Sequence, residues 1–174
     1  MLITTLCYLE KDDAYLMLHR VKKQSDINKG KWIGVGGKCE EGESPEDCVI
    51  REVREETGLT ITNWDFRGVL TFAPIGEEME YIFLFTADAF VGTLHECDEG
   101  VLKWISKDEI EKLELWEGDR VFLRYLREER PFFSLKLVYD GDHLVDLALD
   151  GRRIQLPEER KAEQNPHVGT EGVL

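Results

Sequence analysis

One run of residues in the first half of the chain sets residue types at defined spacings and constrains the fold more than any other feature. It starts at Gly37, places Glu43 after five further residues, and continues after seven more with Arg51-Glu52-Val53-Arg54-Glu55-Glu56-Thr57-Gly58-Leu59. Several of these positions carry charges that a helix does not need for its own stability. The pattern therefore indicates a functional site built on a loop and the helix that follows it.

Local signals predict where this helix begins and ends. Ser44 followed by Pro45 is typical of an N-cap with proline in the first turn, and Asp47 stands where the acid of a capping box would. Gly58 is expected to stop the helix in a left-handed conformation. The predicted helix therefore has about three and a half turns.

Three glutamates fall on one stripe of the predicted helix. At about 100° per residue, Glu52, Glu55 and Glu56 lie in one sector, beside the apolar stripe of Val49, Ile50 and Val53. Like charges at these spacings repel each other, so a plain surface gains nothing from them. A hard divalent cation such as Mg²⁺ or Mn²⁺ turns the repulsion into coordination, because it takes oxygen ligands. A solvated acidic face is the alternative, and the complete motif favours the metal.

Composition limits the class of protein. The 174 residues suit one domain with appendages, and a hydrophobic fraction of 42% is ordinary for a globular chain. The net charge of −14 argues against a groove for nucleic-acid polymers, which requires clustered Lys and Arg, but not against single nucleotides. The cysteines show no metal-finger spacing and are typical of free thiols in a reducing cytoplasm: Cys7, Cys39, Cys48 and Cys97.

The start of the chain predicts a strand. Met1 to Leu9 is apolar but has no basic start, and the charged run Glu10-Lys11-Asp12-Asp13 ends it too early for a signal or a membrane span. We therefore expect a cytoplasmic protein with no membrane partner.

The rest of the pattern mixes strands and helices, which predicts an α/β layered domain. Ser106 with Glu109 matches a second capping box and predicts a short helix to about Leu113, while apolar spacing predicts an amphipathic helix over Glu117–Glu128. Asp140-Gly141-Asp142 predicts a hairpin turn. Strands are expected at Leu2–Leu9, Ala14–Arg20, Trp32–Val35, Phe66–Phe72, Tyr81–Phe90, Val101–Ile105, Leu135–Tyr139 and His143–Leu149.

The motif resembles the Nudix box, G-x5-E-x7-R-E-U-x-E-E-x-G-U with U aliphatic, at every defined position. The resemblance to the Nudix hydrolases extends over about Leu2 to Leu126 and implies an α/β/α sandwich, a mixed β-sheet between helices, with the box at the sheet edge. Residues 1–156 are expected to form this domain, including a C-terminal hairpin at 133–150, and residues 157–174 a polar tail.

The resemblance implies hydrolysis of a nucleoside diphosphate linked to another group, with a metal-bound water attacking one phosphorus. Glu52, Glu55 and Glu56 would bind the Mg²⁺ or Mn²⁺, and the carbonyl of Gly36 would be a further ligand. Glu52 or Glu55 would also serve as the base that takes the proton of the water.

Residues around these glutamates are assigned by the same resemblance. Arg51 is expected to pair with box carboxylates such as Glu43 and to orient them. Glu99 lies in a loop where related enzymes place an additional catalytic or metal-binding glutamate, and a solvated acidic turn is the alternative. Arg20 and Lys38 would contact phosphate, with plain surface cations as the alternative.

Substrate choice is suggested by a second resemblance, to the MutT-type purine nucleoside triphosphatases. There a tryptophan stacks on the base and an acid bonds to its edge, and Trp116 and Asp119 occupy those places; a core aromatic is the alternative for Trp116. Some oxidised-purine enzymes carry asparagine where this chain has Ile33, whose apolar side chain cannot form a hydrogen bond with a purine edge. We therefore predict hydrolysis of purine (deoxy)nucleoside triphosphates, with 8-oxo-dGTP and nucleotide-pool sanitation left open, to the monophosphate and pyrophosphate.

Other functions compete with this one. ADP-ribose or nucleotide-sugar hydrolysis is the alternative, since members of that group often carry a proline where Pro74 lies, fifteen residues after Leu59; proline is also a natural loop residue. A non-catalytic nucleotide-sensing module usually loses box glutamates, and an isoprenoid diphosphate isomerase usually has an irregular box. The substrate is thus expected to be a small nucleotide, and the protein a monomer or a homodimer.

Overall fold

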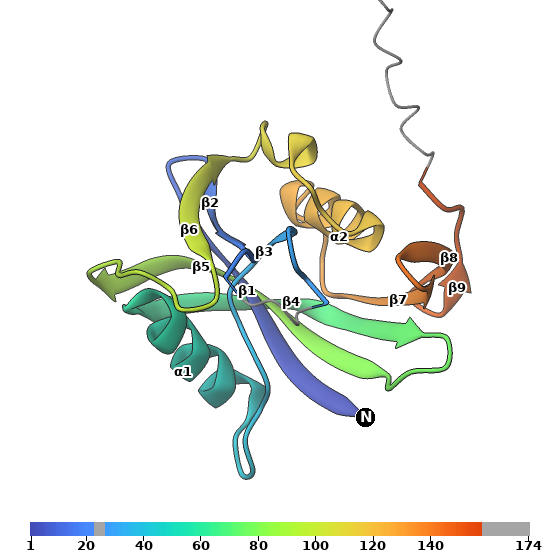
Figure 1. Ribbon diagram of the computed structural model, residues 1–174, viewed down its shortest axis with the longest axis horizontal. Coiled ribbons are helices and arrows are strands. Elements are labelled where there is room, and N and C mark those ends of the chain that lie inside the picture. Colours follow the sequence, from blue (N-terminus) through green and yellow to red (C-terminus); the bar gives the residue numbers. More distant parts are fainter. Residues whose placement is uncertain (23–26, 158–174) are drawn as a thin grey trace, which may run out of the picture.

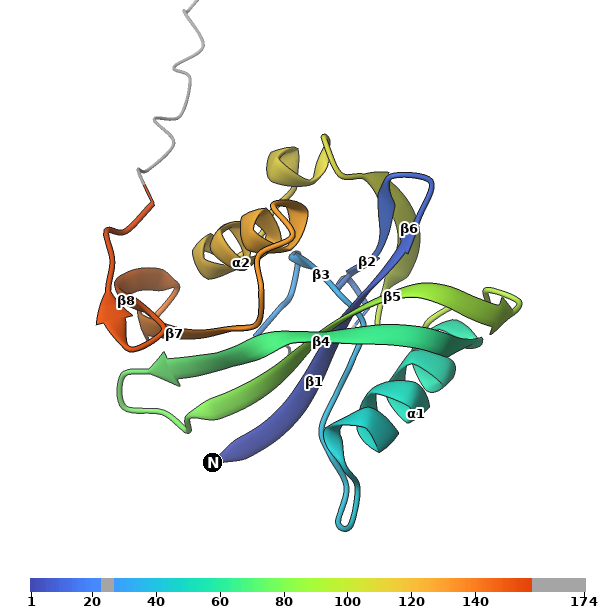
Figure 2. The same cartoon turned by 180° about the vertical axis from the view of Figure 1, so that it is seen from behind.

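A mixed β-sheet separates two helices in this protein. The computed structural model describes residues 1–22 and 27–157. Helix α1 (Pro45–Thr57) covers one face of the sheet, and helix α2 (Glu117–Arg127) covers the other (Figures 1 and 2). The predicted α/β/α sandwich is confirmed.

The described residues form nine strands in one continuous network. The spatial order is β3-β2-β1-β5-β4-β7-β8-β9, and β6 pairs with β2 outside this path. Strand β1 is parallel to β5, and β4 is parallel to β7. The strands are β1 (Leu2–Lys11), β2 (Ala14–His19), β3 (Trp32–Ile33), β4 (Leu59–Pro74), β5 (Glu80–Gly92), β6 (Val101–Ser106), β7 (Phe133–Asp140), β8 (His143–Leu149) and β9 (Arg152–Arg153).

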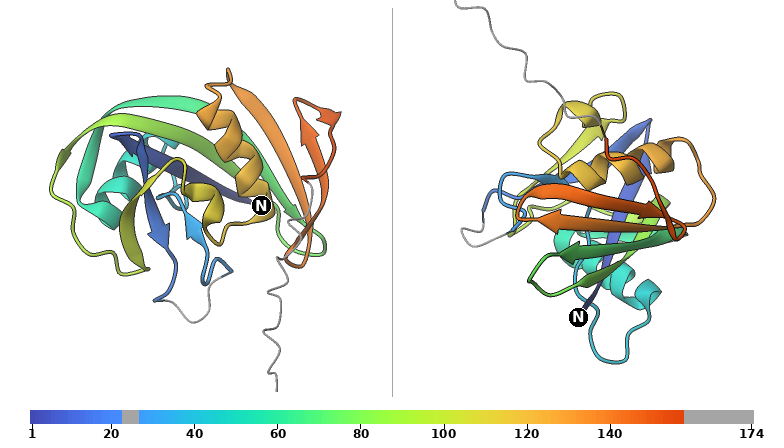
Figure 3. Two further views of the ribbon diagram at one scale, coloured as in Figure 1. Left: turned by 90° about the horizontal axis from the view of Figure 1, so that it is seen from above. Right: turned by 90° about the vertical axis from the view of Figure 1, so that its right-hand side faces the viewer.

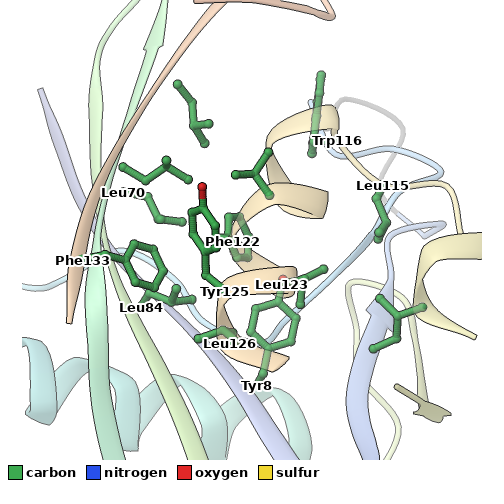
Figure 4. Packing of buried hydrophobic residues seen from close by; sticks show 14 of the residues in the cluster. Tyr8, Leu70, Leu84, Leu115, Trp116, Phe122, Leu123, Tyr125, Leu126 and Phe133 are labelled. Carbon is green, nitrogen blue, oxygen red and sulfur yellow. The ribbon is translucent and has the colours of Figure 1, made fainter. Parts of the chain in front are cut away.

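The two faces of β1 build two separate cores. Successive side chains of a strand point to opposite faces. Tyr8 is fully buried beside Phe122 of α2, in the cluster that Figure 4 shows. Cys7 and Leu9 are buried in the other cluster, with Val53 of α1. Each helix is therefore held by its own apolar layer, and the sheet lies between them.

Helix α1 begins and ends as the sequence predicts. The amide of Asp47 donates to Ser44 Oγ at 3.1 Å, and the amide of Ser44 donates to Asp47 Oδ2 at 3.0 Å, which completes the capping box. Gly58 has a φ of 78°, and its amide donates to Arg54 O at 2.9 Å. A side chain at Gly58 would lie 2.5 Å from the carbonyl of Thr93, so space as well as conformation requires glycine.

The second predicted capping box is wrong. Ser106 is the last residue of β6, where it pairs with Ala14, and the chain then forms only the short 3₁₀ helix η1 (Ile110–Lys112). No side chain caps η1, and the carboxylate of Glu109 pairs with Lys112 at 2.7 Å. The ladder of β6 holds Ser106 in extended backbone, so it cannot start a helix.

The C-terminal hairpin belongs to the sheet. Strand β7 pairs with β4 over Gly68–Pro74 and with β8 on its other side (Figure 3). Gly141, with a φ of 57°, lies in the predicted turn.

Strand β3 is shorter than predicted, because Val35 pairs with Cys7 only as an isolated bridge. The predicted tail lies outside the described residues apart from Pro157, and no described helix is long and apolar enough to cross a membrane.

The two serines that resemble caps in the sequence give a matched test. Replacing Ser44 with Ala should lower the free energy of unfolding by about 1 kcal/mol, because the backbone amide of Asp47 in the first turn of α1 loses its acceptor. Ser106→Ala should change it by less than about 0.5 kcal/mol, as is usual for surface positions. Urea unfolding measures both values, and equal losses would contradict the assignment of the cap.

Candidate active site

A cleft of about 590 Å³ lies where the box loop, the sheet and the start of α2 meet. This volume is within the usual range for small-molecule sites. One group of lining residues is polar: Arg20, Gly36, Gly37, Lys38, Glu52, Glu56 and Glu99. Another group is apolar or aromatic: Ile33, Leu70, Phe72, Ile82, Trp116, Phe122, Leu137 and Tyr139. The cleft therefore offers both a charged and an apolar environment to one ligand.

The glycine turn before α1 lets the carboxylates of the helix approach the main chain closely. A Cβ atom added to Gly37 would lie 2.5 Å from the carboxylate carbon of Glu52. A Cβ atom added to Gly36, whose φ is 155°, would lie 2.1 Å from the carbonyl oxygen of Thr5 in β1. Both glycines are therefore needed for space, because the turn is packed between the strand and the helix.

Glu56 is a buried acid among other acids. Its side chain is 9% exposed, and its Oε2 accepts a hydrogen bond of 2.9 Å from the amide of Gly36. Burial raises the pKa of Glu56 to about 8, and the nearby Glu99 and Glu52 raise it further against the hydrogen bond from Gly36. Such a group favours a neutralising partner, either a proton or a cation.

Glu99 lies in the same cleft, at the end of the β2–β6 ladder where the last residue of β2 pairs with the first residue of β6. The guanidinium of Arg20 forms an ion pair with Glu99, and its Nη1 lies 3.9 Å from Glu56 Oε1. Lys38 also lines the cleft. The structure thus brings Arg20, Lys38 and Glu99 into one cleft with two of the box carboxylates, Glu52 and Glu56.

Arg51 links the loop before α1 to the helix. Its Nε and Nη2 donate to the two carboxylate oxygens of Glu43 at 2.6 and 2.9 Å, and its Nη1 donates to Glu52 Oε1 at 2.7 Å. The bond from Arg51 lowers the pKa of Glu43 to about 2. Arg51 Nη2 also donates to the carbonyl of Lys38 at 3.1 Å. One guanidinium therefore sets the position of Glu52 and of the loop.

Glu55 lies apart from the other box glutamates. Its side chain is 61% exposed and lies 3.3 Å from Arg51 Nη1, on a shallow surface depression with Arg54 and His95. Glu52 and Glu56 line the cleft, whereas Glu55 is absent from its lining. Within residues 1–22 and 27–157, no three His, Cys, Asp or Glu side chains are close enough together to hold a metal ion.

The donor atoms that line the cleft are of the chemical type that a hard divalent cation binds, although the carboxylates would have to move closer together to share one cation. Glu52, Glu56 and Glu99 offer carboxylate oxygens, and Gly36 lies beside them on the turn. Burial is the main cause of the raised pKa of Glu56, and the charges of Glu99 and Glu52 add to it against the opposing charge of Arg20. A cation at this place would relieve the repulsion.

Trp116 belongs both to the core and to the cleft. Its ring packs edge-on against Tyr139 with centroids 5.6 Å apart, and Lys31 Nζ lies 5.3 Å from its centroid. Its Nε1 donates to Asn28 Oδ1 at 2.8 Å. Asp119 lines the same part of the cleft, and burial raises its pKa to about 7 against the opposing charges of Lys31 and Arg120.

Two polar residues of the cleft were not indicated by the sequence. Asn28 lies in a polar loop with no motif, and its contact with Trp116 spans 88 positions. The hydroxyl of Tyr139, from the C-terminal hairpin, accepts a 2.8 Å bond from the amide of Gly118. No local signal in the sequence reveals either contact, because both depend on long-range packing.

The chain is similar to known proteins over most of its length. The family model of the NUDIX domain matches residues 2–126. The Nudix hydrolase YvcI of Bacillus subtilis is 34% identical over 87% of this chain and 96% of its own. The oxidized purine nucleoside triphosphate hydrolase of Mus musculus is 31% identical over 73% of this chain and 82% of its own.

Solved structures agree with these sequence relatives. The crystal structure of the mMutator MutT protein from Bacillus halodurans superimposes with a TM-score of 0.79. It is 28% identical to this chain and covers 86% of it, with 98% of the MutT chain aligned. The aligned share includes more of this chain than the family model does, which reaches residue 126.

The raised pKa of Glu56 predicts how stability depends on pH. An unfolded Glu56 ionises near pH 4.5, whereas the folded group ionises near 8, so the folded state binds more protons between these values. We therefore expect the melting temperature of the metal-free protein to fall as the pH rises from about 5 to 8, with Asp119 contributing in the same direction.

Divalent cations should counteract this fall. Added Mg²⁺ should raise the melting temperature more at pH 8 than at pH 5.5, because protons compete for the carboxylates at the lower pH. Scanning calorimetry with EDTA or Mg²⁺ measures the difference. Glu56→Gln should remove part of the pH dependence and most of the Mg²⁺ effect; an unchanged Mg²⁺ effect would place the cation elsewhere.

Proposed function

The chain belongs to the Nudix family and is a hydrolase of phosphorus-containing anhydrides, and from this premise we propose that it cleaves purine (deoxy)nucleoside triphosphates, oxidised forms such as 8-oxo-dGTP included, to the monophosphate and pyrophosphate. One observation carries the proposal: a single cleft contains both the carboxylates Glu52, Glu56 and Glu99 and the aromatic ring of Trp116. A triphosphate at one end and a base at the other would occupy it.

The carboxylate part of the cleft would receive the phosphates. Glu52, Glu56 and Glu99 would hold Mg²⁺ or Mn²⁺, with the carbonyl of Gly36 as a further ligand. A cation bound there would lower the pKa of water and would neutralise charge on the phosphates. Arg20 lies beside Glu56 and Glu99 and would bind a phosphate oxygen in place of part of its ion pairing.

The positions of Glu52 and Glu55 also bear on which of them accepts the proton of the attacking water. Glu52 lines the cleft, and the 2.7 Å bond from Arg51 Nη1 fixes its carboxylate, so it is better placed than Glu55 to take a proton from the attacking water. Glu55 has an exposed carboxylate and a longer contact with Arg51, of 3.3 Å. We propose that it completes the ligand set by turning toward a bound cation.

The aromatic part would receive the base. The face of Trp116 would stack on it, and Asp119 would bond to its edge. Lys38, which follows the glycine turn and lines the cleft, would contact phosphate. The mouse relative, an oxidized purine nucleoside triphosphate hydrolase, supports the choice of a purine triphosphate.

One observation favours a second candidate function. Pro74 lines the cleft, at the end of β4. It is the residue on which the expectation of ADP-ribose or nucleotide-sugar hydrolysis rests. A substrate with a second sugar would extend from the phosphates toward this edge.

A substrate panel tests the proposed function. Pyrophosphate and phosphate release would be measured with Mg²⁺ for dGTP, 8-oxo-dGTP, dATP, dCTP, ADP-ribose and a nucleotide sugar. We expect pyrophosphate from the purine triphosphates, with a value of kcat/KM at least about tenfold above that for dCTP. Turnover confined to ADP-ribose or the sugar would replace the proposal with the second candidate.

Single replacements test the carboxylates. Glu52→Gln, Glu55→Gln and Glu56→Gln should each lower kcat at least about a hundredfold, because each removes a charge that acts on the reacting phosphates. Glu128→Gln, an exposed glutamate after α2, is the control and should retain activity. Near-wild-type turnover of the Glu55 variant would remove that residue from the site, and the same result for Glu52 or Glu56 would contradict the metal site.

A further inference from the structure

The C-terminal hairpin of β7 and β8 lies beyond residue 126, where the match to the family model ends. It nevertheless supplies two side chains to the lining of the cleft, Leu137 and Tyr139. Strand β7 is parallel to β4, and the carbonyl of Tyr139 accepts a 2.8 Å bond from the amide of Ile75, so the backbone is fixed at this point. The hairpin therefore contributes to the cleft as well as to the sheet.

Helix α2 begins without the side-chain cap that is common at helix starts. The first amides of a helix have no carbonyl partner within the helix, and Ser, Thr, Asp or Asn at the N-cap position commonly accepts from one of them. The N-cap residue of α2 is Trp116, which forms no such bond, because its indole carries a donor and no acceptor. An acceptor for these amides has to come from another part of the chain.

Tyr139 supplies this acceptor from the hairpin. Its hydroxyl oxygen accepts a 2.8 Å hydrogen bond from the amide of Gly118, the second residue of α2, and both residues are buried. The absence of a side chain at Gly118 permits the approach, since a Cβ atom there would lie 2.9 Å from the hydroxyl of Tyr139 and from the side chain of Leu137. The bond therefore ties the first turn of α2 to β7.

The ring of Tyr139 also contacts the aromatic part of the cleft. It packs edge-on against Trp116, with centroids 5.6 Å apart, and against Phe72 of β4, with centroids 5.2 Å apart. All three rings line the cleft. Gly118 lies between Trp116 and Asp119 in the chain, so the bond to its amide fixes the backbone segment that carries both residues.

We propose that Tyr139 is a positioning residue for the substrate: through its hydroxyl, the C-terminal hairpin holds the first turn of α2 where Trp116 and Asp119 line the cleft. This inference rests on the proposed function, because it takes that part of the cleft to bind the base of a nucleotide. The carboxylates at the other end of the cleft lie on α1 and in the loop before β6, so they do not depend on this bond. The hairpin thus controls nucleotide binding and leaves the chemical step unaffected.

Tyr139→Phe tests the bond itself, because it removes the hydroxyl and keeps the ring contacts. The amide of Gly118 should exchange its hydrogen at least about tenfold faster in this variant, since it has lost its buried acceptor. Hydrogen exchange followed by NMR spectroscopy on the full chain measures the rate.

Steady-state hydrolysis of dGTP and dATP with Mg²⁺ tests the consequence for the substrate. Tyr139→Phe should raise KM about fivefold, as for the loss of one buried hydrogen bond, and should leave kcat within about twofold. A variant that is merely less folded would instead show a lower kcat at an unchanged KM, because fewer molecules would be active.

Pyrophosphate is a probe that has no base. With Mg²⁺, its inhibition constant should stay within about twofold in Tyr139→Phe, because it would occupy only the carboxylate end of the cleft. Weakening of pyrophosphate to the same degree as the nucleotides would show a general disturbance of the site.

Tyr15→Phe is the matched control. Tyr15 belongs to the same buried cluster as Tyr139, but it does not line the cleft, and its hydroxyl bonds to no amide of α2. The replacement also removes one buried hydroxyl and keeps a ring. The exchange rate of Gly118, KM and kcat should each stay within about twofold of the wild-type values.

The outcomes separate this inference from the proposed function. An unchanged exchange rate at Gly118, an unchanged KM in Tyr139→Phe, or an equal rise of KM in Tyr15→Phe would overturn the positioning role of Tyr139 while the purine cleft stands. Equal weakening of pyrophosphate would overturn it as well. If the wild-type protein hydrolyses neither dGTP nor dATP, the proposed function fails, and the inference fails with it.

Discussion

The close packing of the Gly36–Gly37 turn between β1 and α1 is the constraint on which the site depends. The carbonyl of Gly37 accepts a bond from the amide of Thr5 at 2.8 Å, and the amide of Gly36 donates to Glu56 at 2.9 Å. The turn thereby ties the strand to the helix and leaves no space for side chains at either glycine. Any displacement of the turn would move Glu52 and Glu56 relative to the cleft, so the spacing of the box is a consequence of this packing.

This arrangement has an electrostatic cost. In a chain with a net charge of −14, Glu52, Glu56 and Glu99 line one cleft, and the cations near them include Arg20, Lys38 and Arg51. Removing charges from water disfavours their ionised form, and like charges add to this. A fold without a function for these groups would gain stability from neutral residues there. The cost is understandable if a divalent cation and a phosphate chain complete the charge balance.

Much of the fold and part of the site could be predicted, because the signals are local. The caps of α1 lie within the helix sequence, and the alternation of the strands is visible residue by residue. To predict that Glu55 is exposed, one also has to know how α1 is rotated about its axis. Packing of Val49 and Val53 sets the rotation of α1, and Glu55 lies on the side of the glutamate stripe away from these valines, at about 60° from Glu52. It is therefore exposed, while Glu52 and Glu56 line the cleft.

Other features could not be predicted, because they arise from contacts between distant segments. The bond between Asn28 and Trp116 joins a polar loop to the start of α2, and Tyr139 reaches Gly118 from the C-terminal hairpin. Ser106 and Glu109 have the residue types of a capping box, yet pairing of β6 with β2 keeps Ser106 in a strand. Tertiary structure overrides local preference at such positions.

The proposed function requires one cleft to hold both the cation and the base. A crystal structure with Mn²⁺ and a non-hydrolysable dGTP analogue, with the metal located by anomalous scattering, tests it most directly. We expect a manganese peak in contact with the carboxylates of Glu52 and Glu56, and the base against the ring of Trp116. A peak confined to the outer side of α1 beside Glu55, or a base bound away from Trp116, would contradict it.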